Sequence, residues 1–264
     1  MLISGDHEQA RVWAILVDGK SVAILKKHHV LSSARLERRS YEHIKRGRLP
    51  QVPVLLGRCP DDPRYLLMSV LHGGRLPIET AHYQAAGRWL RMLHRQSFTD
   101  TDPISISRAL QMRLAAARGV LKSDVSTRRW ALLGDYLADS VPDDRIWCHR
   151  DFRARNWVVT EDPSRLGIID FGQSRPDYWL IDWVHVRLET LHEPQLWAAF
   201  VRGYGRALDE AHGRLFRGLI GLTGVASLAW AKQHGHLARQ AEGWRYLACF
   251  EEMVASKMPC LPEC

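Results

Sequence analysis

The sequence predicts an α+β fold in two lobes, a small β-rich lobe at the N-terminus and a larger, mainly helical lobe after it. Up to about residue 71, short apolar or alternating segments surround one amphipathic stretch, a pattern typical of strands around a single helix. Gly73-Gly74 then interrupts the chain, and the apolar residues beyond it recur mainly at helical spacing. We therefore expect lobes of residues 1–71 and 72–264, enough chain to bury a large core.

The N-terminal elements are predicted from alternation and from turn residues. Four strands are expected, at residues 10–17, 21–27, 52–56 and 65–71. Asp18-Gly19-Lys20 joins the first two strands and is a strong hairpin signal. Between the two strand pairs, Ser32 or Ser33 can cap a helix that continues to Arg46, and Gly47 is a typical helix stop.

The C-terminal part is predicted to be helical around one strand–turn–strand unit. Helices are expected at residues 78–94, twice between 107 and 138, and repeatedly between 183 and 257. The longest uncharged stretch, residues 218–231, is shorter than the roughly 20 apolar residues of a membrane span. It indicates a buried core helix, so we expect no membrane association and no signal peptide.

Charge and cysteine content argue against some classes of function. The net charge of +8 suggests nucleic-acid binding, but the densest basic segment, residues 35–48, offers only Tyr41 as an aromatic platform. A solvated helix face explains that segment better, so no nucleic-acid partner is expected. The five cysteines lack metal-ligand spacing, which indicates reduced thiols in a cytoplasmic protein. Cys148 is interpreted as a buried filler rather than a nucleophile.

Three oxygen-bearing side chains fall on the strand–turn–strand unit. Asn156 opens an apolar run, residues 162–164 predict a turn, and a second apolar run ends at Asp170. Folded about Pro163, this hairpin would place Asn156 and Asp170 roughly opposite each other, about 5 Å apart at the backbone. Two such oxygen ligands suit Mg2+, which fills its other positions with phosphate and water. Asp151, on the loop before the first strand, is then free to meet a substrate hydroxyl.

The same residues carry a family resemblance. His149, Asp151 and Asn156 stand in the spacing His-x-Asp-x-x-x-x-Asn and are followed by Asp-Phe-Gly at residues 170–172, similar to the catalytic and metal-binding loops of kinases. In this order and flanked by strands, they resemble the aminoglycoside phosphotransferase family, the small-molecule branch of the protein-kinase-like fold. The resemblance implies a bilobal kinase-like fold with Asp151 as the catalytic proton acceptor and Asn156 and Asp170 as the ligands of Mg2+. The alternative is a structural hairpin with His149 as a core histidine.

A buried carboxylate is predicted on the first helix. At about 100° per residue, Glu37 falls in one arc with mostly apolar neighbours, whereas Glu42 lies opposite, among basic residues. That arc also contains Leu36, Ser40, Tyr41 and Ile44. A carboxylate on such a face needs a cation or hydrogen bonds. Lys26 and Lys27 end the preceding strand, and strand alternation does not choose between them; the resemblance favours Lys26 as the lysine that holds the ATP phosphates.

The resemblance also implies contacts with the nucleotide in the 1–71 lobe. Ser4 and Gly5 look like a degenerate nucleotide-covering turn before the first long strand. The backbone groups of Ser69 and Val70 would contact adenine, and apolar side chains such as Ile24 would meet its face. Backbone recognition leaves no side-chain signature, so these contacts stay expectations from the resemblance alone.

Three features concern the catalytic loop and its surroundings. Asp182 resembles the family aspartate that holds the catalytic loop through its backbone. Arg150 departs from the small-molecule family, where this position is often small, and a surface or inter-loop arginine is the simplest interpretation. The chain after Asp-Phe-Gly runs from Gln173 straight into helix near Asp182, which leaves no room for an ordinary activation loop, so a protein-substrate kinase is not expected. Only proximity in sequence suggests that Gln173 and Arg153 face the acceptor.

The expected function is ATP-dependent O-phosphorylation of a hydroxylated small molecule, with ATP and Mg2+ as cofactors. Family analogy points to an antibiotic of aminoglycoside, peptide or nucleoside type that phosphorylation inactivates. The seven acidic residues among 187–257, against nine basic ones, give no sign of a strongly acidic site for a polycation. The alternatives are a kinase of choline- or homoserine-like metabolites and a nucleotide-binding regulatory protein without catalysis. The protein is expected to be a monomer or a dimer.

Overall fold

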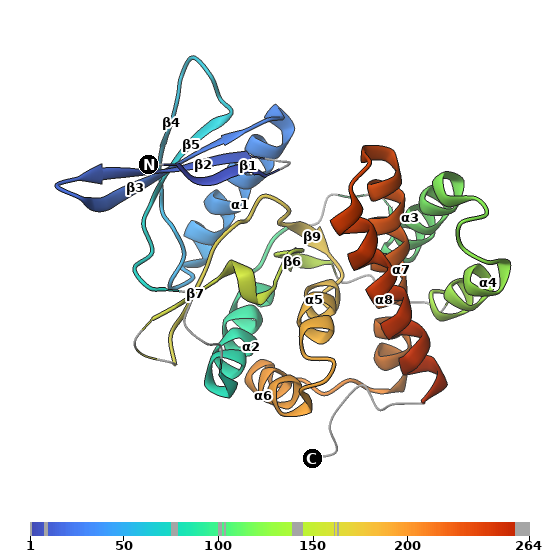
Figure 1. The fold of residues 1–264 in the computed structure, drawn as a ribbon. Helices are drawn as coiled ribbons and strands as arrows, with labels where there is room; N and C mark the ends of the chain where they lie inside the picture. Colours follow the sequence, from blue (N-terminus) through green and yellow to red (C-terminus); the bar gives the residue numbers. More distant parts are fainter. Residues whose placement is uncertain are drawn as a thin grey trace.

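The computed structural model describes residues 2–7, 10–74, 79–99, 102, 104–138, 145–160, 162 and 164–256, the first of these ranges by its backbone alone. Figure 1 shows a small sheet with one helix at one side of the molecule and a larger body of helices at the other, with short strands between them. Strands dominate the first part of the chain and helices the rest, so the predicted α+β class is confirmed.

The N-terminal sheet has five antiparallel strands in the order β1-β2-β3-β5-β4. They are β1 (Leu2–His7), β2 (Ala10–Val17), β3 (Lys20–His28), β4 (Leu55–Arg58) and β5 (Tyr65–Ser69). The predicted β2–β3 hairpin is present: Val17 pairs with Lys20, and Asp18 and Gly19 have positive φ of 49° and 74°, as in a type I′ turn. Helix α1 (Leu31–Gly47) packs against β3, β4 and β5.

Two expectations about the strands need correction. Ser4 and Gly5 lie within β1, where Ser4 pairs with Val12 of β2, and do not form the expected turn. The β1–β2 connection at residues 8–9 lies outside the described residues. Strand β4 begins three residues later than expected, because Pro53 has no N–H with which to extend the ladder toward Val52.

The ends of α1 also differ from the prediction. The helix begins at Leu31, and Val30 occupies the N-cap position without a side-chain hydrogen bond, so neither Ser32 nor Ser33 caps it. At the other end, Arg48 takes the left-handed conformation with φ 53°, and its N–H reaches the carbonyl oxygens of the last turn. Gly47 is the last helical residue and not the left-handed cap.

The remaining elements form the helical part and the predicted strand–turn–strand unit. They are α2 (Thr80–His94), α3 (Ile106–Leu121), α4 (Thr127–Tyr136), β6 (Ile146–Cys148), the 3-10 turn η1 (Ala154–Asn156), β7 (Trp157–Val159), β8 (Leu166–Ile168), β9 (Arg175–Asp177), α5 (Ile181–Glu189), α6 (Pro194–Tyr204), α7 (Glu210–His234) and α8 (Leu237–Ala255). The uncharged stretch at residues 218–231 lies within α7, most of its side chains buried against α3, α4, α5 and α8. Among the described residues, no helix is long and apolar enough to cross a membrane.

The core lies mainly in the helical part and includes a cluster of aromatic side chains around α5. Trp183 is fully buried and meets the rings of Trp197, Phe200, Tyr204 and Phe216 at centroid distances of 5.0–6.3 Å, mostly edge to face. Through these ring contacts α5 packs against α6 and α7. The core therefore surrounds α5, the helix that begins just before Asp182 and follows the Asp-Phe-Gly segment.

Gly73, just after β5, allows the linker between sheet and helices to contact the catalytic hairpin. Gly74 exchanges hydrogen bonds with Val159 of β7, with N···O distances of 2.9 and 3.1 Å. A Cβ on Gly73 would lie 2.5 Å from the Val159 carbonyl oxygen, and the residue has φ 155°. Only glycine satisfies both conditions at once.

Replacing Gly73 tests this close approach. We expect Gly73→Ala to lower the free energy of unfolding by about 2–4 kcal/mol, because it adds a clash to a strained φ. Gly74→Ala is the matched control: nothing lies within 4 Å of its would-be Cβ, so it should change little. Urea unfolding of both variants makes the comparison, and a Gly73→Ala variant as stable as the Gly74→Ala variant would contradict the assignment.

Candidate active site

The hairpin that carries Asn156 and Asp170 is present, with a register one residue away from the predicted one. Trp157 pairs with Ile168, and the N–H of Ile169 donates to the carbonyl oxygen of Asn156 at 3.0 Å. Asn156 therefore stands opposite Ile169, and Asp170 follows one residue beyond the ladder. The apolar pattern alone could not set this register, because it does not give the number of residues in the turn. Pro163, about which the hairpin was expected to fold, lies outside the described residues.

Asp151 and Asn156 are joined directly. The Asn156 amide nitrogen donates to the backbone oxygen of Asp151 at 2.8 Å and to its carboxylate Oδ2 at 3.0 Å. Arg155 Nη2 also donates to Oδ2, at 3.0 Å, and Arg153 Nε lies 2.7 Å from Oδ1. Since the Asn156 nitrogen is held in this way, its amide oxygen is the atom available to another ligand.

Asp170 lies beside the predicted lysine–glutamate pair. Lys26 Nζ is 2.9 Å from Asp170 Oδ1 and 2.9 Å from Glu37 Oε2, and His28 Nε2 lies 2.6 Å from that same Glu37 oxygen. Glu37 is fully buried on α1, whereas Glu42 is exposed and pairs with Arg38. The lysine that strand alternation left open is thus Lys26. Its neighbour Lys27 lies over the ring of Tyr65.

Charge compensation keeps these groups ionised. The positive charge of Lys26 holds the pKa of Asp170 well below its usual range. Burial alone would lower the pKa of Lys26, but the charges of Asp170 and Glu37 outweigh it and raise that pKa. Burial likewise favours a protonated Asp151, yet Arg153, His185 and Arg155 together lower the pKa of its carboxyl. Both aspartates are therefore carboxylates at neutral pH.

Asp182 holds the backbone of the loop that carries Asp151. Its buried carboxylate accepts the N–H of His149 at 2.8 Å and the N–H of Arg150. His94 Nε2 donates to it as well, at 2.9 Å. Arg150 has φ 66°, a left-handed conformation that is uncommon for a non-glycine residue, and the hydrogen bonds to Asp182 hold the backbone there. The sequence-based expectation that Asp182 supports this loop through its backbone agrees with these contacts.

The Arg150 side chain joins two segments. Its Nε lies 3.0 Å from Oδ2 of Asp177 on β9, and Arg113 of α3 donates to the same oxygen at 2.8 Å. The Arg150 guanidinium therefore connects the catalytic loop to β9, as an inter-loop arginine.

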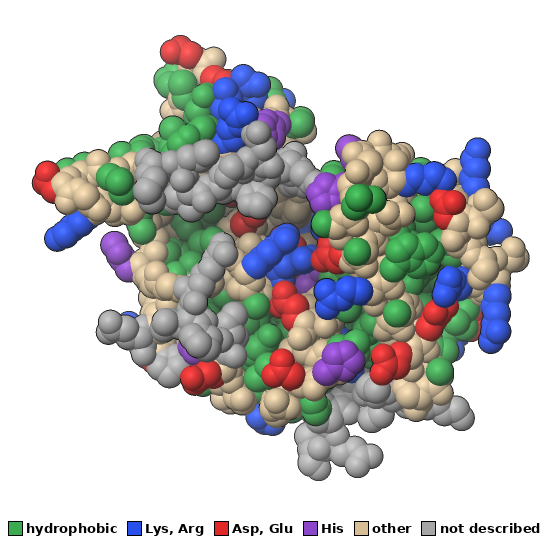
Figure 2. All heavy atoms as spheres, viewed as in Figure 1, with side chains coloured by type: hydrophobic (Ala, Val, Ile, Leu, Met, Phe, Trp, Pro, Cys, Tyr) green, Lys and Arg blue, Asp and Glu red, His purple; other side chains and the backbone are tan. Residues whose placement is uncertain are grey.

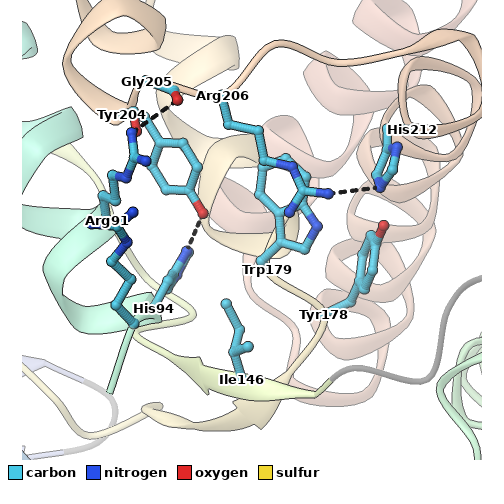
Figure 3. A pocket seen from close by; sticks show the side chains of 10 residues that line it. Arg91, His94, Ile146, Tyr178, Trp179, Tyr204, Gly205, Arg206 and His212 are labelled. Carbon is cyan, nitrogen blue, oxygen red and sulfur yellow. Dashed lines mark hydrogen bonds between the residues drawn. The ribbon is translucent and has the colours of Figure 1, made fainter. Parts of the chain in front are cut away.

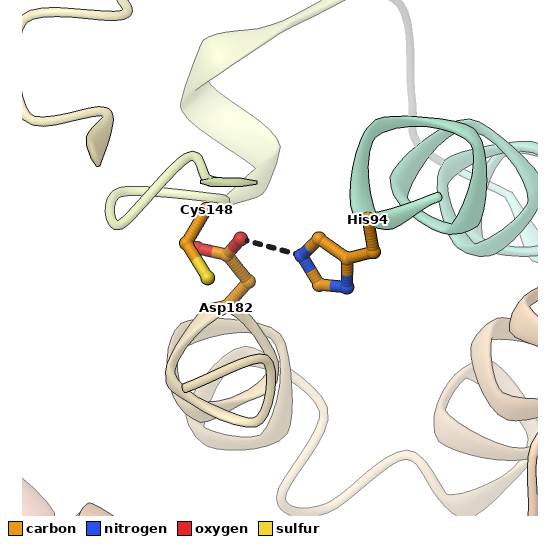
Figure 4. Close-up of side chains that lie close together, drawn as sticks. All are labelled: His94, Cys148 and Asp182. Carbon is orange, nitrogen blue, oxygen red and sulfur yellow. Dashed lines mark hydrogen bonds and ion pairs between the residues drawn. The ribbon is translucent and has the colours of Figure 1, made fainter. Parts of the chain in front are cut away.

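His94, Cys148 and Asp182 lie within 4.8 Å of one another, close enough to suggest a metal site (Figure 4). Burial and the nearby carboxylates of Asp182 and Asp177 raise the pKa of the Cys148 thiol well above its usual value, so the sulfur stays protonated. Its Sγ lies 3.5 Å from the carbonyl oxygen of Asp177. The Asp182 oxygens accept the N–H groups of His149 and Arg150 and contact His94, so this cluster is a structural hydrogen-bond network.

The remaining predicted nucleotide contacts lie around the end of β5. The N–H of Ser69 donates to the Val54 carbonyl oxygen at 2.9 Å, and its hydroxyl accepts the Val54 N–H at 2.8 Å. The Ser69 N–H is therefore engaged within the protein, and Val70 is the first residue beyond the strand. Ile24, on β3, pairs with Met68. Ser4 and Gly5 lie on β1, described by backbone alone.

Sequence reasoning missed several residues of this site. Arg153 is buried and links Asp151 to His185 of α5, at 2.6 Å, and to Glu242 of α8, at 2.8 Å. The sequence singled Arg153 out only by its proximity to Asp151. His28 gave no signal beyond its position two residues after Lys26 on the same strand face. Figure 2 shows basic and acidic side chains close together in the hollow between the sheet and the helices.

Comparisons with known proteins identify the relatives of this fold. The family model described as "Phosphotransferase enzyme family" (APH) matches residues 1–218. No match is found among the curated proteins. An aminoglycoside phosphotransferase solved in ternary complex with AMP-PNP and hygromycin B has a TM-score of 0.74 at 17% identity, covering 95% of this chain and 92% of that one.

Two further solved structures are similar over nearly the whole chain. The GDP complex of a mutant of aminoglycoside 2'-phosphotransferase-IIIa has a TM-score of 0.71 at 16% identity, with coverage of 97% of this chain and 93% of that one. A choline/ethanolamine kinase family protein from Mesorhizobium loti has a TM-score of 0.66 at 17% identity, with coverage of 95% and 92%. At these identities the likeness shows the fold alone, the bilobal kinase-like fold that the sequence predicted.

The buried ion pair predicts unequal effects for two glutamates of α1. Glu37→Ala would leave Lys26 and His28 buried without their carboxylate, so we expect the free energy of unfolding to fall by about 3–5 kcal/mol. Glu42→Ala removes an exposed partner of Arg38 on the opposite face and should cost less than about 1 kcal/mol. Urea unfolding measures both, and similar losses would show that Lys26 does not need Glu37.

Proposed function

The chain belongs to the phosphotransferase enzyme family, and we propose that it transfers the γ-phosphoryl group of ATP to a hydroxyl of a small molecule. Among possible acceptors we favour an antibiotic that the transfer inactivates. In this proposal residues 1–71 are the nucleotide-binding lobe, and residues 72–264 carry the catalytic loop and the acceptor site. The observation that carries the proposal is a pair of contacts at the hairpin: the Asn156 amide donates to the Asp151 carboxylate at 3.0 Å, and Lys26 Nζ donates to the Asp170 carboxylate at 2.9 Å.

The residues at the hairpin fit a magnesium ion. Asn156 offers its amide oxygen, because Asp151 holds the nitrogen, and the half-exposed Asp170 carboxylate has a second oxygen besides the one that Lys26 contacts. An amide and a carboxylate oxygen suit Mg2+, which keeps places for phosphate oxygens and water. When bound, the ion would neutralise charge on the phosphates of ATP. Asn156 and Asp170 would hold it.

Lys26 would bind the phosphates of the nucleotide. It is cationic, buried, and fixed between Glu37 and Asp170, so a phosphate oxygen would meet an ammonium that is already oriented. A fixed charge needs no reorganisation when negative charge shifts toward the leaving ADP oxygen. Glu37 and His28 keep the lysine in place.

Asp151 would orient the acceptor hydroxyl. Its Oδ2 already accepts two donors, while Oδ1 is contacted by Arg153 and keeps a lone pair for a hydroxyl proton. The acceptor oxygen forms a bond to the γ-phosphorus, the bond to the β-phosphate oxygen breaks, and the hydroxyl proton passes to Asp151. Because Asp151 is a weak base with a lowered pKa, positioning of the hydroxyl is its main contribution.

The surroundings of Asp151 favour acceptors without a positive charge beside the reacting hydroxyl. Arg153 and Arg155 both contact its carboxylate, and the Arg155 side chain is 58% exposed. Two acidic side chains nearby are already engaged, Glu242 of α8 by Arg153 and Arg239 and Glu189 of α5 by the Ala154 N–H. These cations support a neutral or anionic acceptor. A metabolite kinase remains the second candidate, but the same charges count against a choline-like cation as its substrate. A purely regulatory nucleotide-binding protein has no need of the ordered Asp151.

Replacing Asp151 tests the catalytic proposal. We expect Asp151→Asn to lower ATP turnover with a working acceptor by about 100- to 10,000-fold, with little change in Mg-ATP affinity. Asp162→Asn is the matched control, because Asp162 lies at the exposed tip of the same hairpin. Coupled ADP release and calorimetry give the two readouts. A folded Asp151→Asn variant with the turnover of the wild type would refute the role of Asp151.

A panel of acceptors tests the proposed acceptor class. We expect ADP release to be stimulated by neutral or anionic hydroxyl compounds more than by polycationic aminoglycosides, because like charges near Asp151 repel. Arg155→Ala should shift the ratio of kcat/KM toward cationic acceptors by about 10-fold or less. The panel comprises aminoglycoside, peptide and nucleoside antibiotics with choline-like metabolites. An unchanged ratio would exclude Arg155 from acceptor selection, and no stimulation by any compound would contradict the antibiotic assignment.

A further inference from the structure

A second pocket is lined by His94, the histidine that contacts Asp182. It has a volume of about 420 Å³ and is formed by the end of α2, the end of α6, the start of α7 and residues beside β6 and β9. A cavity of this size suits a small organic ligand. Nothing in the predicted phosphotransfer uses it.

The lining of this pocket is cationic. Arg91, Arg95 and Arg206 line it, and none of its lining residues is acidic. Two carboxylates that contact lining residues are already engaged: Asp182 by His94 and backbone N–H groups, and Asp209 by His212 at 2.7 Å. Guanidinium groups bind carboxylates and phosphates through paired N–H donors. The charge of the lining therefore selects an anion.

The planar group that this lining exposes to a ligand is the Arg206 guanidinium, beside the buried rings of Trp179 and Tyr204 (Figure 3). It lies 4.4 Å from the centroid of the Trp179 ring, and that ring is stacked on Tyr204 with an interplanar angle of 10°. The guanidinium is planar by resonance, and its contact with the indole ring restrains its orientation. Arg91 Nη1 donates to the carbonyl oxygens of Tyr204 and Gly205, which neutralises the negative end of α6 where it meets the pocket.

From this lining we propose that the pocket is a binding site for a small aromatic anion, a phosphate or carboxylate on a planar group, that acts on the catalytic loop. The connection is a chain of hydrogen bonds. The Tyr204 hydroxyl donates to His94 Nδ1 at 2.8 Å, His94 Nε2 donates to Asp182, and Asp182 accepts the N–H groups of His149 and Arg150. A ligand that contacts Tyr204 and His94 therefore reaches the backbone before Asp151 through two side chains, those of His94 and Asp182.

Calorimetry with phenyl phosphate tests binding, with the predicted nucleotide site saturated by Mg-ADP. We expect one site per chain, with inorganic phosphate and neutral benzyl alcohol each binding at least about 10-fold more weakly, which corresponds to 1.4 kcal/mol. The double variant Arg95→Gln/Arg206→Gln should lose at least about 10-fold in affinity. Arg88→Gln, an exposed arginine of α2 outside the lining, is the matched control and should bind like the wild type.

The possible outcomes separate the parts of the proposal. No binding, or equal binding by the double variant, would overturn the site, and equal affinity for inorganic phosphate would overturn its aromatic component. Hydrogen exchange of the amides of His149 and Arg150 tests the connection to the loop. Slower exchange with phenyl phosphate in the wild type, but not in the double variant, is expected, and unchanged exchange would overturn the coupling. These readouts need no turnover, so they do not depend on the proposed function.

Discussion

The carboxylate of Asp182 is the constraint on which the candidate site depends. It is fully buried, and it accepts the N–H groups of His149 and Arg150 and a hydrogen bond from the His94 ring. Hydrogen bonds to a buried charge are stronger than those between neutral groups. They can therefore hold Arg150 at a positive φ and fix the direction in which the chain leaves toward Asp151. The same carboxylate connects the loop to the aromatic core around α5.

A second constraint connects the sheet to the catalytic hairpin. Lys26 of β3 contacts both Glu37 of α1 and Asp170 after β8, so one ammonium group draws three elements together. Burying this charge is favourable only while both carboxylates remain. Gly73 and Gly74 add a backbone contact to Val159 on the other strand of the hairpin. The hairpin therefore contacts the sheet through a side chain and the linker after the sheet through its backbone. These contacts hold together a site whose residues come from distant parts of the chain.

The fold class and most elements followed from local pattern. The β2–β3 hairpin, the amphipathic α1 with Glu37 on its buried face, and the core helix within α7 all have a signal within a few turns of chain. The predicted ends of the strands and helices were less accurate where a single backbone group decides them. Strand β4 begins after Pro53, which lacks an N–H, and α1 begins without the expected serine cap. The strand at Ser4 and Gly5 was missed although it pairs with the neighbouring β2, because residues 2–7 show no alternating apolar pattern and contain Gly5 and Asp6, which are rare in strands.

For the candidate site, the kinase-like spacing of Asp151, Asn156 and Asp170 and the periodicity of Glu37 predicted the central residues of the proposal, because each pattern depends on neighbours close in sequence. The register of the hairpin, the choice of Lys26 over Lys27, and the link from Arg153 to α8 required the folded chain. These contacts join residues separated by 11 to 144 positions, and their partners are chosen by packing and by compensation of buried charge. A local sequence pattern does not specify these contacts, because many side chains of suitable chemistry could form each of them.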